Sequence, residues 1–396
     1  IKEHKFYNDN IMDRFYKLSL LSENMDVEDG ENLTTSLAQC PERAKLEKHP
    51  AITYAKMSGG KTIPLLKSVI TSACERNCKY CSFRAGRDFR RYSFSPIEMA
   101  DTYLDLFKKG IAQGLFLSSG IAGGGVTTQD KIIDTAEILR NNRKYQGYLH
   151  LKIMPGAEYD QIFNLMRWAD RVSINLEAPN PERLKLLAPK KNFGEELFTR
   201  IKWADQIRKR EDPRKNWNKK WPSITTQLVV GPSGENDIEI LKASEYLIKN
   251  LHLSRIYYMT FTPVIGTPFE NLPAENPLRG HRLYQASFLI RDYGFSFEDI
   301  SFDNLGCLSL DTDPKSYWAN QHLRENPLEI NFASKEELLR VPGIGPKRVE
   351  LIAKFRKNQT IKTENDLRNL GVPLEKVSDY LLLNGKRIPH QLKFAF

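Results

Sequence analysis

The sequence predicts an α/β protein, in which a partial (β/α)6 barrel follows an N-terminal helical extension and precedes a small all-α domain. Six apolar, β-branched runs alternate with helical patterns between residues 65 and 306. Strict alternation of this kind is typical of a parallel sheet with helices on its outside. The chain has 396 residues, of which 40% are hydrophobic, so it can bury a barrel core without disulfide bonds.

Each element can be assigned from its own pattern. Residues 1–64 predict the helical extension, because apolar residues recur at helical spacing in IMDRFYKLSLLSENM. The predicted strands are residues 65–73, 115–120, 148–156, 171–179, 224–231 and 255–263. The helix after the first strand begins at Ser95, where Glu98 completes a capping box, and it ends at Gly110. Residues 307–327 carry turn signals and predict a linker to the helical domain of residues 328–396.

Three cysteines follow the first predicted strand in the spacing C-x3-C-x2-C: Cys74, Cys78 and Cys81. Three thiolates on one loop can hold three corners of a cubane [4Fe-4S] cluster and leave one iron without a protein ligand. A structural zinc site would need a fourth Cys or His, and none lies near this loop. Three buried or zinc-bound cysteines are the alternative interpretation.

The remaining cysteines and the first residues indicate the compartment. Cys40 and Cys307 form no paired spacing, which favours a reducing, cytoplasmic setting. The opening IKEHKFYNDNIMDRFYKL is polar and mixed in charge, unlike a signal peptide, and no apolar stretch approaches the length of a membrane span. We therefore expect a cytoplasmic protein with no membrane partner.

Polar residues gather at the carboxyl ends of the predicted strands, where (β/α) barrels place their active sites. Asn175 and Glu177 alternate along the fourth strand and therefore share one face. A buried polar pair at a barrel mouth needs a partner, which favours a binding role. Lys152 and Thr260, taken singly, are more typical of solvated strand ends.

The cysteine spacing, with Tyr80 directly before the last cysteine, resembles the signature of the radical SAM superfamily. The likeness extends from about Leu65 to about Gly306. It implies that S-adenosylmethionine (SAM) binds the open iron through its amino and carboxylate groups and yields a 5′-deoxyadenosyl radical. The positions that match cofactor-binding strand ends are Tyr80, Ser118, Ser119, Gly120, Lys152, Asn175, Glu177, Gln227, Val229, Thr260 and Thr262.

The resemblance also implies a role for most of these residues. Residues 118–120 replace the superfamily's Gly-Gly-Glu segment, which receives the methionyl amino group, so serine hydroxyls or backbone carbonyls must substitute for the missing Glu. Asn175 and Glu177 suit the two ribose hydroxyls, and Lys152 suits the cofactor carboxylate. The residues expected to pack against the adenine are Gln227 and Val229.

A second motif, VPGIGPKRVELI, lies in the predicted helical domain. Gly343 and Gly345 allow a tight turn with outward-pointing N–H groups, and Ile344 between them locks the turn by burial. Pro346 fits the first position of a helix whose N-terminus would face a phosphate. The charged residues beside this turn are Lys347 and Arg348.

This segment resembles the tandem helix-hairpin-helix domain of the bacterial competence DNA receptor. The second copy, residues 361–382, is degenerate, since LGVPLEK stands where a second glycine pair is expected. We therefore expect the first copy to make the phosphate contact. Packing against another protein is the alternative use of such a hairpin.

Two further basic stretches and a net charge of +10 favour a polyanionic partner. RAGRDFRRY places four arginines just after the cysteines: Arg84, Arg87, Arg90 and Arg91. In residues 208–221, Trp217 and Trp221 alternate with Lys and Arg. That pattern is equally compatible with stacking on unpaired bases and with a solvated loop held by two core tryptophans.

The combination of both domains resembles one family in particular, radical SAM proteins assigned to DNA modification or repair and linked to a uracil-DNA-glycosylase-like partner. The likeness includes KLSLLSENM and SINLEAPN. It implies a nucleic acid substrate, with DNA favoured over RNA, whose target base is flipped out of a duplex or lies in a single strand. It also implies an electron donor such as flavodoxin or ferredoxin. The alternatives are an enzyme that modifies tRNA or another RNA and a non-catalytic DNA-binding iron–sulfur scaffold for a glycosylase.

A thymine-dimer lyase is a narrower form of the DNA hypothesis. Cys307 would then be a weak candidate for a catalytic, hydrogen-donating thiol. A buried, inert cysteine is the more ordinary interpretation, since free cysteines are commonly buried.

Overall fold

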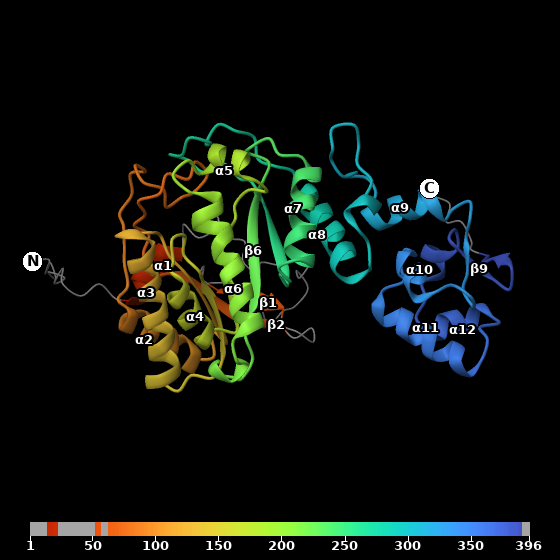
Figure 1. The fold of residues 1–396 in the computed structure, drawn as a ribbon, viewed down its shortest axis with the longest axis horizontal. Coiled ribbons are helices and arrows are strands. Elements are labelled where there is room, and N and C mark those ends of the chain that lie inside the picture. The colour runs from red at the N-terminus through yellow and green to blue at the C-terminus, as the bar shows by residue number, and fades with distance from the viewer. Residues whose placement is uncertain (1–13, 23–51, 57–61, 390–396) are drawn as a thin grey trace, which may run out of the picture. The chain divides into compact units, whose positions relative to one another are not determined.

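The structure is a computed structural model that describes residues 14–22, 52–56 and 62–389 (Figure 1). It contains two compact units. The first comprises Ile1–Glu235 with Leu251–Glu275, and the second comprises Asn236–Asn250 with Asn276–Phe396. Much of the predicted helical extension, with Cys40, lies outside the described residues. None of the described helices is long and apolar enough to cross a membrane.

A curled seven-stranded sheet forms the centre of the first unit, with its strands in sequence order from β1 to β7 (Figure 1). The strands are β1 (Ile52–Lys56), β2 (Thr62–Val69), β3 (Gly114–Ser118), β4 (Tyr148–Lys152), β5 (Arg171–Ser173), β6 (Ser223–Val230) and β7 (Arg255–Thr260). Strands β2 to β7 are parallel, which confirms the six predicted strands and the partial barrel.

Strand β1 was not foreseen in the predicted helical extension. It pairs antiparallel with β2, with Ile52 opposite Leu66 and Ala55 opposite Ile63. The alternation of ITYAK is typical of a strand, but five residues within a polar stretch are too short a pattern to predict one. The lead-in is therefore not all helical.

Parallel strands covered on both faces read as continuous apolar runs, and this is why the central strands were predictable. All five residues of β3 are buried, and seven of the eight residues of β6 are buried. Helices cover the outside of this sheet: α1 (Arg14–Ser22), α2 (Pro96–Lys108), α3 (Gly124–Glu137), α4 (Tyr159–Trp168) and α6 (Thr199–Arg210). The short helix α5 (Pro181–Leu187) lies beside the cysteine loop instead, where Lys79 N donates to Leu187 O at 2.8 Å. Neighbouring helices contact each other from α2 through α3 and α4 to α6.

The second unit begins with the two helices that follow β6 and β7 in sequence, α7 (Asp237–Lys249) and α8 (Pro277–Asp292). Residues 307–327, predicted as a linker, include helix α9 (Pro314–His322). Ala319 and Leu323 from this segment are part of the same buried core as the hairpin residues Ile344 and Ile352. The segment is therefore a packed part of the C-terminal unit.

Two helical hairpins share this core. The first joins α10 (Lys335–Arg340) to α11 (Pro346–Asn358), and the second joins α12 (Glu364–Asn369) to α13 (Leu374–Val377). A small sheet of β8 (Leu328–Glu329), β9 (Leu381–Leu383) and β10 (Lys386–Arg387) is an addition to the predicted all-α domain. The turn of its β9–β10 hairpin is Asn384-Gly385, with positive φ at both residues, as a two-residue hairpin turn requires.

Candidate functional site

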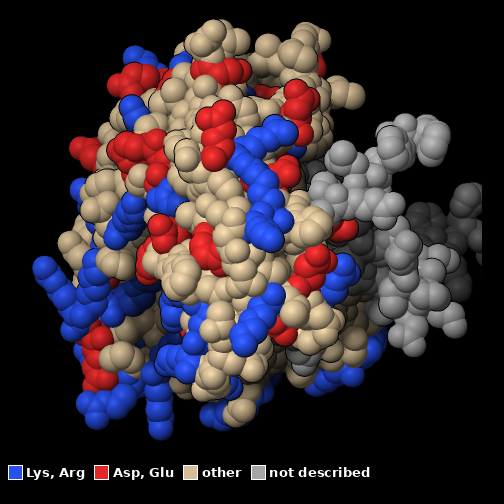
Figure 2. Space-filling model, turned by 90° about the vertical axis from the view of Figure 1, so that its right-hand side faces the viewer, with Lys and Arg blue, Asp and Glu red and all other residues tan. Residues whose placement is uncertain are grey.

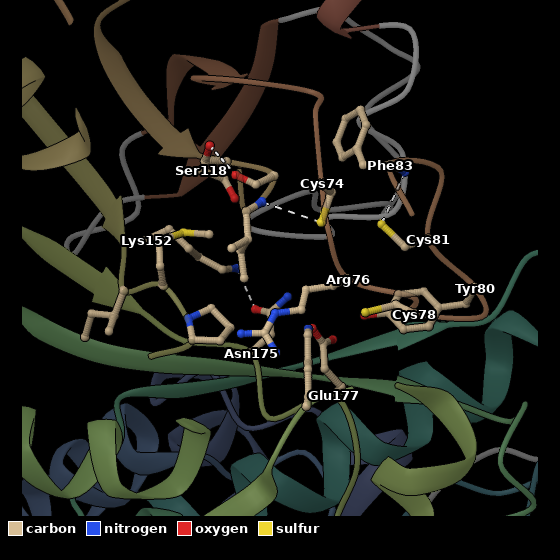
Figure 3. Close-up of a pocket in the computed structure, with 17 residues that line it drawn as sticks. Cys74, Arg76, Cys78, Tyr80, Cys81, Phe83, Ser118, Lys152, Asn175 and Glu177 are labelled. Atoms are coloured by element: carbon tan, nitrogen blue, oxygen red, sulfur yellow. Dashed lines mark hydrogen bonds and ion pairs between the residues drawn. The ribbon is translucent and has the colours of Figure 1, made fainter. Parts of the chain in front are cut away.

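The three motif cysteines lie on the loop between β2 and α2. Backbone hydrogen bonds fasten this loop to the segment after β3, from Gly120 N to Thr71 O (2.8 Å) and from Glu75 N to Ile121 O (2.8 Å). Two thiols also accept backbone N–H bonds, Cys74 from Ile121 (3.5 Å) and Cys81 from Phe83 (3.4 Å) (Figure 3). The loop therefore has a defined path before any ligand binds.

All three cysteines line one cavity at the carboxyl ends of the first strands (Figure 3). Seven of the predicted cofactor residues line the same cavity: Tyr80, Ser118, Ser119, Gly120, Lys152, Asn175 and Glu177. The sequence did not identify Arg76 and Lys191, which also line it.

Glu177 and Lys191 form a buried ion pair in this cavity, with 2.7 Å between Oε1 and Nζ and side chains 4% and 9% exposed. The second carboxylate oxygen, Oε2, is buried and makes no hydrogen bond of normal geometry. Glu177 has φ 66°, an uncommon left-handed conformation for a residue with a side chain. Its backbone holds this position by bonding to β6, from Glu177 N to Gln227 O and from Val229 N to Glu177 O.

A second polar pair joins neighbouring strand ends. The Lys152 ammonium, at the end of β4, donates to Asn175 Oδ1 at 2.6 Å, and both side chains are buried. Asn175 and Glu177 line the same cavity, but β5 ends at Ser173 and Glu177 has a left-handed φ, so the two are not alternate residues of one strand as expected. The cavity thus presents cationic, amide and carboxylate groups beside the three thiols.

Burial shifts the pKa values of the ionisable side chains that line the cavity. It raises the pKa of the Cys78 and Cys81 thiols and of the Tyr80 hydroxyl, because a charged form is poorly solvated there. The Lys191 ammonium opposes this effect at Cys78. Although burial alone would lower the pKa of Lys191, Cys78 and Glu177 together raise it, so Lys191 is a permanent cation at this site.

The remaining predicted cofactor residues do not line the cavity. Gln227 and Val229 are buried in β6, and Gln227 Nε2 lies 3.5 Å from Met259 Sδ. The β6–β7 register places Thr260 opposite Val230, on the other face of the sheet from Gln227 and Val229. Thr262 follows the end of β7 and is exposed, and the β7 residues that share the face of Gln227 are Tyr257 and Met259.

Arg91 fastens the cluster loop from within. Its guanidinium donates to the carbonyls of Ser72 and Phe83 at 2.6 Å, and it also bonds the carbonyls of Arg84 and Arg87. Arg87 donates to Ser82 O and to Ile265 O, each at 3.0 Å. Two of the four arginines predicted for nucleic acid therefore hold the loop, and of the four only Arg90 is exposed.

The tryptophans of the other basic stretch are packed against the protein. Trp217 lies under the guanidinium of Arg140, with Cζ 3.6 Å from the ring centroid, and Trp221 is buried and donates Nε1–H to Glu211 O. The loop precedes β6, so it lies at the amino ends of the strands, opposite the cysteine loop. This packing favours the core-anchoring interpretation for both tryptophans.

We expect a side chain at Gly120, which lines the cavity, to destabilise the fold. A Cβ at this residue would lie 2.3 Å from Ala73 O, in the backbone that leads to Cys74. Because backbone atoms cannot rotate aside, Gly120→Ala is expected to lower the free energy of unfolding by about 1–3 kcal/mol. Urea unfolding followed by tryptophan fluorescence measures this loss. Gly194→Ala is the control, because its Cβ would approach nothing closer than 3.7 Å, and equal losses in both variants would contradict the prediction.

In the second unit, the first hairpin has the predicted conformation. Gly343 has φ 82°, Ile344 is 1% exposed, and Pro346 begins α11 after the N-cap residue Gly345. Among the described residues, no acceptor bonds the backbone N–H groups of Gly345, Lys347 and Arg348. Figure 2 shows Lys and Arg side chains gathered along the lower part of the face that it draws.

The second hairpin repeats this turn without its donors. Gly371 has φ 70° and Val372 is buried, as at Gly343 and Ile344, but Pro373 stands where Gly345 provides an N–H. Arg348 connects the two turns, donating to Gly371 O (2.6 Å) and Gly343 O (2.7 Å). These two bonds give Arg348 a structural role besides the predicted phosphate contact.

Cys307 lies in a loop of the second unit and is partly exposed. Its backbone N–H donates to Asp303 Oδ1 at 2.8 Å. Burial, with the nearby Asp237, raises the pKa of its thiol, so the thiol is protonated near neutral pH. The interpretation as an inert, uncharged cysteine is consistent with this environment.

Comparison with known proteins identifies two regions. Residues 68–247 match the family model of the radical SAM superfamily, and residues 328–355 match that of the helix-hairpin-helix motif. No curated protein matches the chain. The radical SAM match includes all three motif cysteines and every residue named above as lining the cavity.

Several solved structures resemble the chain at low sequence identity. Methylornithine synthase (PylB) is 15% identical, with a TM-score of 0.44 over 57% of this chain and 61% of the other. The FeFe-hydrogenase maturase HydG from Carboxydothermus hydrogenoformans is 17% identical, with a TM-score of 0.42 over 57% of this chain and 51% of the other. Coproporphyrinogen III oxidase (HemN) from Escherichia coli is 16% identical, with a TM-score of 0.37 over 57% and 52%. The matched region thus spans about half to three fifths of these proteins.

Proposed function

We propose that the chain is a radical SAM enzyme whose cavity binds a [4Fe-4S] cluster and SAM and whose substrate is a nucleic acid, because residues 68–247 match the radical SAM family model. DNA modification or repair is the activity that we favour. The observation that carries the cofactor assignment is that three loop thiols and the Asn175–Glu177 strand end line one cavity.

The residues present fit this pair of cofactors. Each thiol of a cubane cluster binds a different iron, so the three cysteines of the loop are sufficient and one iron stays open. In the part of the chain that the structure describes, no three His, Cys, Asp or Glu side chains are arranged to hold a single ion. Glu177 Oε2 is buried and has no hydrogen bond of normal geometry, although the Tyr80 hydroxyl interacts with this carboxylate, so Oε2 suits a ribose hydroxyl as a further donor.

When bound, the cluster and SAM supply one-electron cleavage of SAM to methionine and a 5′-deoxyadenosyl radical. The protein's contribution is placement and charge. Cys74, Cys78 and Cys81 would hold the cluster, and Lys191 would offset the negative charge that the Cys78 thiolate then carries. The Lys152 ammonium, now bonded to Asn175, can receive the carboxylate of SAM. The Ser118–Gly120 end of β3 offers hydroxyl and carbonyl oxygens to its amino group.

Support for a nucleic acid comes from the first hairpin. Its unbonded N–H groups lie at the N-terminus of α11, whose dipole favours an anion, and the exposed Lys347 adds a charge there. Such contacts position a protein on a phosphate backbone without reading the base sequence. The helix-hairpin-helix motif therefore suggests the polymer, and the barrel cavity suggests the chemistry.

Lys347→Met is expected to weaken binding of single-stranded DNA and to reduce the slope of log K against log salt by about 1, because one phosphate contact is lost. Fluorescence anisotropy over a salt series measures both quantities. Lys357→Met removes the same charge about 15 Å further along α11 and should leave the slope unchanged. Equal slopes in all three proteins would argue against phosphate binding at this hairpin.

The enzyme proposal is tested by anaerobic reconstitution with iron, sulfide, dithionite and SAM. We expect 5′-deoxyadenosine to form, and to form faster with DNA than with tRNA. Stimulation by tRNA alone would favour an RNA-modifying enzyme, whereas no 5′-deoxyadenosine with any polymer would favour a DNA-binding iron–sulfur scaffold. Mass spectrometry of nucleosides from cells with and without the protein would then identify the product.

Two protein partners belong to this proposal. A flavodoxin or ferredoxin would supply the electron in place of dithionite, and a uracil-DNA-glycosylase-like protein would act on the same DNA. Co-purification of each with the full chain, with and without DNA, tests these partners separately from the chemistry.

A further inference from the structure

A lysine from outside the hairpin motif contacts the centre of the first hairpin. Lys315 lies in the first turn of α9, and its Nζ donates to Ile344 O at 2.5 Å. The same ammonium lies 4.6 Å from the ring centroid of Tyr293, at the end of α8. Tyr293 also supports the turn directly, since its hydroxyl lies 3.1 Å from where a Cβ on Gly345 would be. All these residues belong to the second unit.

The carbonyl that Lys315 contacts is part of the peptide group whose N–H belongs to Gly345. This peptide is trans, so its C=O and N–H point to opposite sides of the chain. The Gly345 N–H has no acceptor among the described residues, whereas the Ile344 carbonyl receives a cation. A cation on the carbonyl oxygen polarises the amide, which strengthens its N–H as a donor, and the bond fixes the plane of the peptide.

We propose that Lys315 is a positioning residue for phosphate, which orients and polarises the Ile344–Gly345 peptide so that the Gly345 N–H donates to a nucleic acid phosphate. This inference rests on the proposed binding of nucleic acid by the first hairpin. Lys315 acts through the peptide and is distinct from Lys347, whose exposed side chain would contact the phosphate itself. The chemistry recognised is a phosphodiester of single-stranded or duplex DNA.

The surroundings of Lys315 make this contact sensitive to pH. Burial lowers the pKa of Lys315 to about 7, and the carboxylate of Asp313, the N-cap residue of its own helix, only partly opposes this effect. Tyr293 faces it from the end of α8, and the charges that act on the tyrosine hydroxyl are Asp292, beside it in sequence, and Arg348 of α11. The Arg340–Asp299 ion pair, at 2.8 Å, is a further charged pair in this unit.

The sign of the pH effect follows from linkage. A bound phosphate stabilises the charged form of Lys315 and so raises its pKa above that of the free protein. DNA binding then takes up a proton. Affinity should be constant below about pH 7 and fall as pH rises above it, by at most about tenfold per pH unit, until the pKa of the complex is reached.

The test is DNA affinity of the full chain between pH 6 and 9, measured by anisotropy with a labelled single-stranded oligonucleotide at fixed salt. We expect Lys315→Met to bind about fivefold or more weakly at pH 6.5, in the range of coupling between neighbouring sites, and to lose the fall above pH 7. Lys315→Arg keeps the charge at every pH, so it should bind at pH 8.5 better than the wild type. Lys347→Met should bind more weakly but keep the fall.

The outcomes separate this inference from the proposed function. If the wild type binds DNA with an affinity that does not change with pH, or if Lys315→Met shows the wild-type profile, the role of Lys315 is overturned while hairpin binding stands. If neither Lys347→Met nor Lys315→Met alters binding, the hairpin proposal itself fails. Thermal unfolding of Lys315→Met controls for loss of the fold, and the wild-type pH profile tests the inference even where that variant is unstable.

Discussion

Alanine at Cys78 is expected to abolish assembly of the iron–sulfur cluster and, with it, all formation of 5′-deoxyadenosine from SAM. Cys78 is the most buried of the three motif cysteines, and it lies beside the Lys191–Glu177 pair. Two thiols cannot hold three corners of a cubane, and among the described residues no further cysteine or histidine lines the cavity. Iron and sulfide content after anaerobic reconstitution, with the visible absorption of the cluster, measures the loss directly.

The chain offers a matched control for this experiment. Cys307 is also a free thiol, but it lies in the second unit and does not line the cavity. Cys307→Ala is therefore expected to bind as much iron as the wild type. Normal iron content in Cys78→Ala, or an equal loss in Cys307→Ala, would refute the assignment of the cluster to the loop.

The barrel could be predicted because its signals are local. Apolar runs such as LFLS in β3 are buried on both faces, and the capping box of Ser95 and Glu98 forms as the sequence indicates. The cysteines and the hairpin glycines were equally clear, since spacing along a loop decides what those residues can do. Asn175 and Glu177 do line the cavity, but they follow the end of β5 at Ser173, so the alternation of a strand is not what places them there.

The residues that the sequence did not reveal act through contacts distant in the chain. Lys191 reaches Glu177 from a segment after α5, and Arg91 bonds carbonyls on both sides of the cysteines, yet each belongs to an ordinary basic stretch. Thr260 and Thr262 do not line the cavity, and the face on which Thr260 lies is fixed only by the register of β7 with β6. Lys315 lay in a predicted linker, and its role depends on how α9 packs against the hairpin.

Removal of the Lys191 ammonium is expected to destabilise the cluster-free first unit by about 3–5 kcal/mol, because it leaves the Glu177 carboxylate buried without a counter-charge. Lys191→Met keeps most of the side-chain volume, so the loss reports charge rather than packing. The effect should be large because both side chains are almost fully buried, unlike the surface pairs of this protein. Four of the five tryptophans, Trp168, Trp203, Trp217 and Trp221, lie in the first unit, so their fluorescence during urea unfolding follows the unit in question.

The double variant Glu177→Gln with Lys191→Met distinguishes a charge effect from a general loss of structure. An uncharged amide beside methionine leaves no buried charge, so the double variant should regain most of the stability that Lys191→Met loses. It should still bind SAM more weakly than the wild type, because the carboxylate proposed for the ribose is gone. Strain at Glu177, with its φ of 66°, persists in all three proteins and therefore cancels from the comparison. If the double variant is no more stable than Lys191→Met, the buried pair is not an electrostatic unit, and the placement of Glu177 must depend on its backbone bonds to Gln227 and Val229 alone.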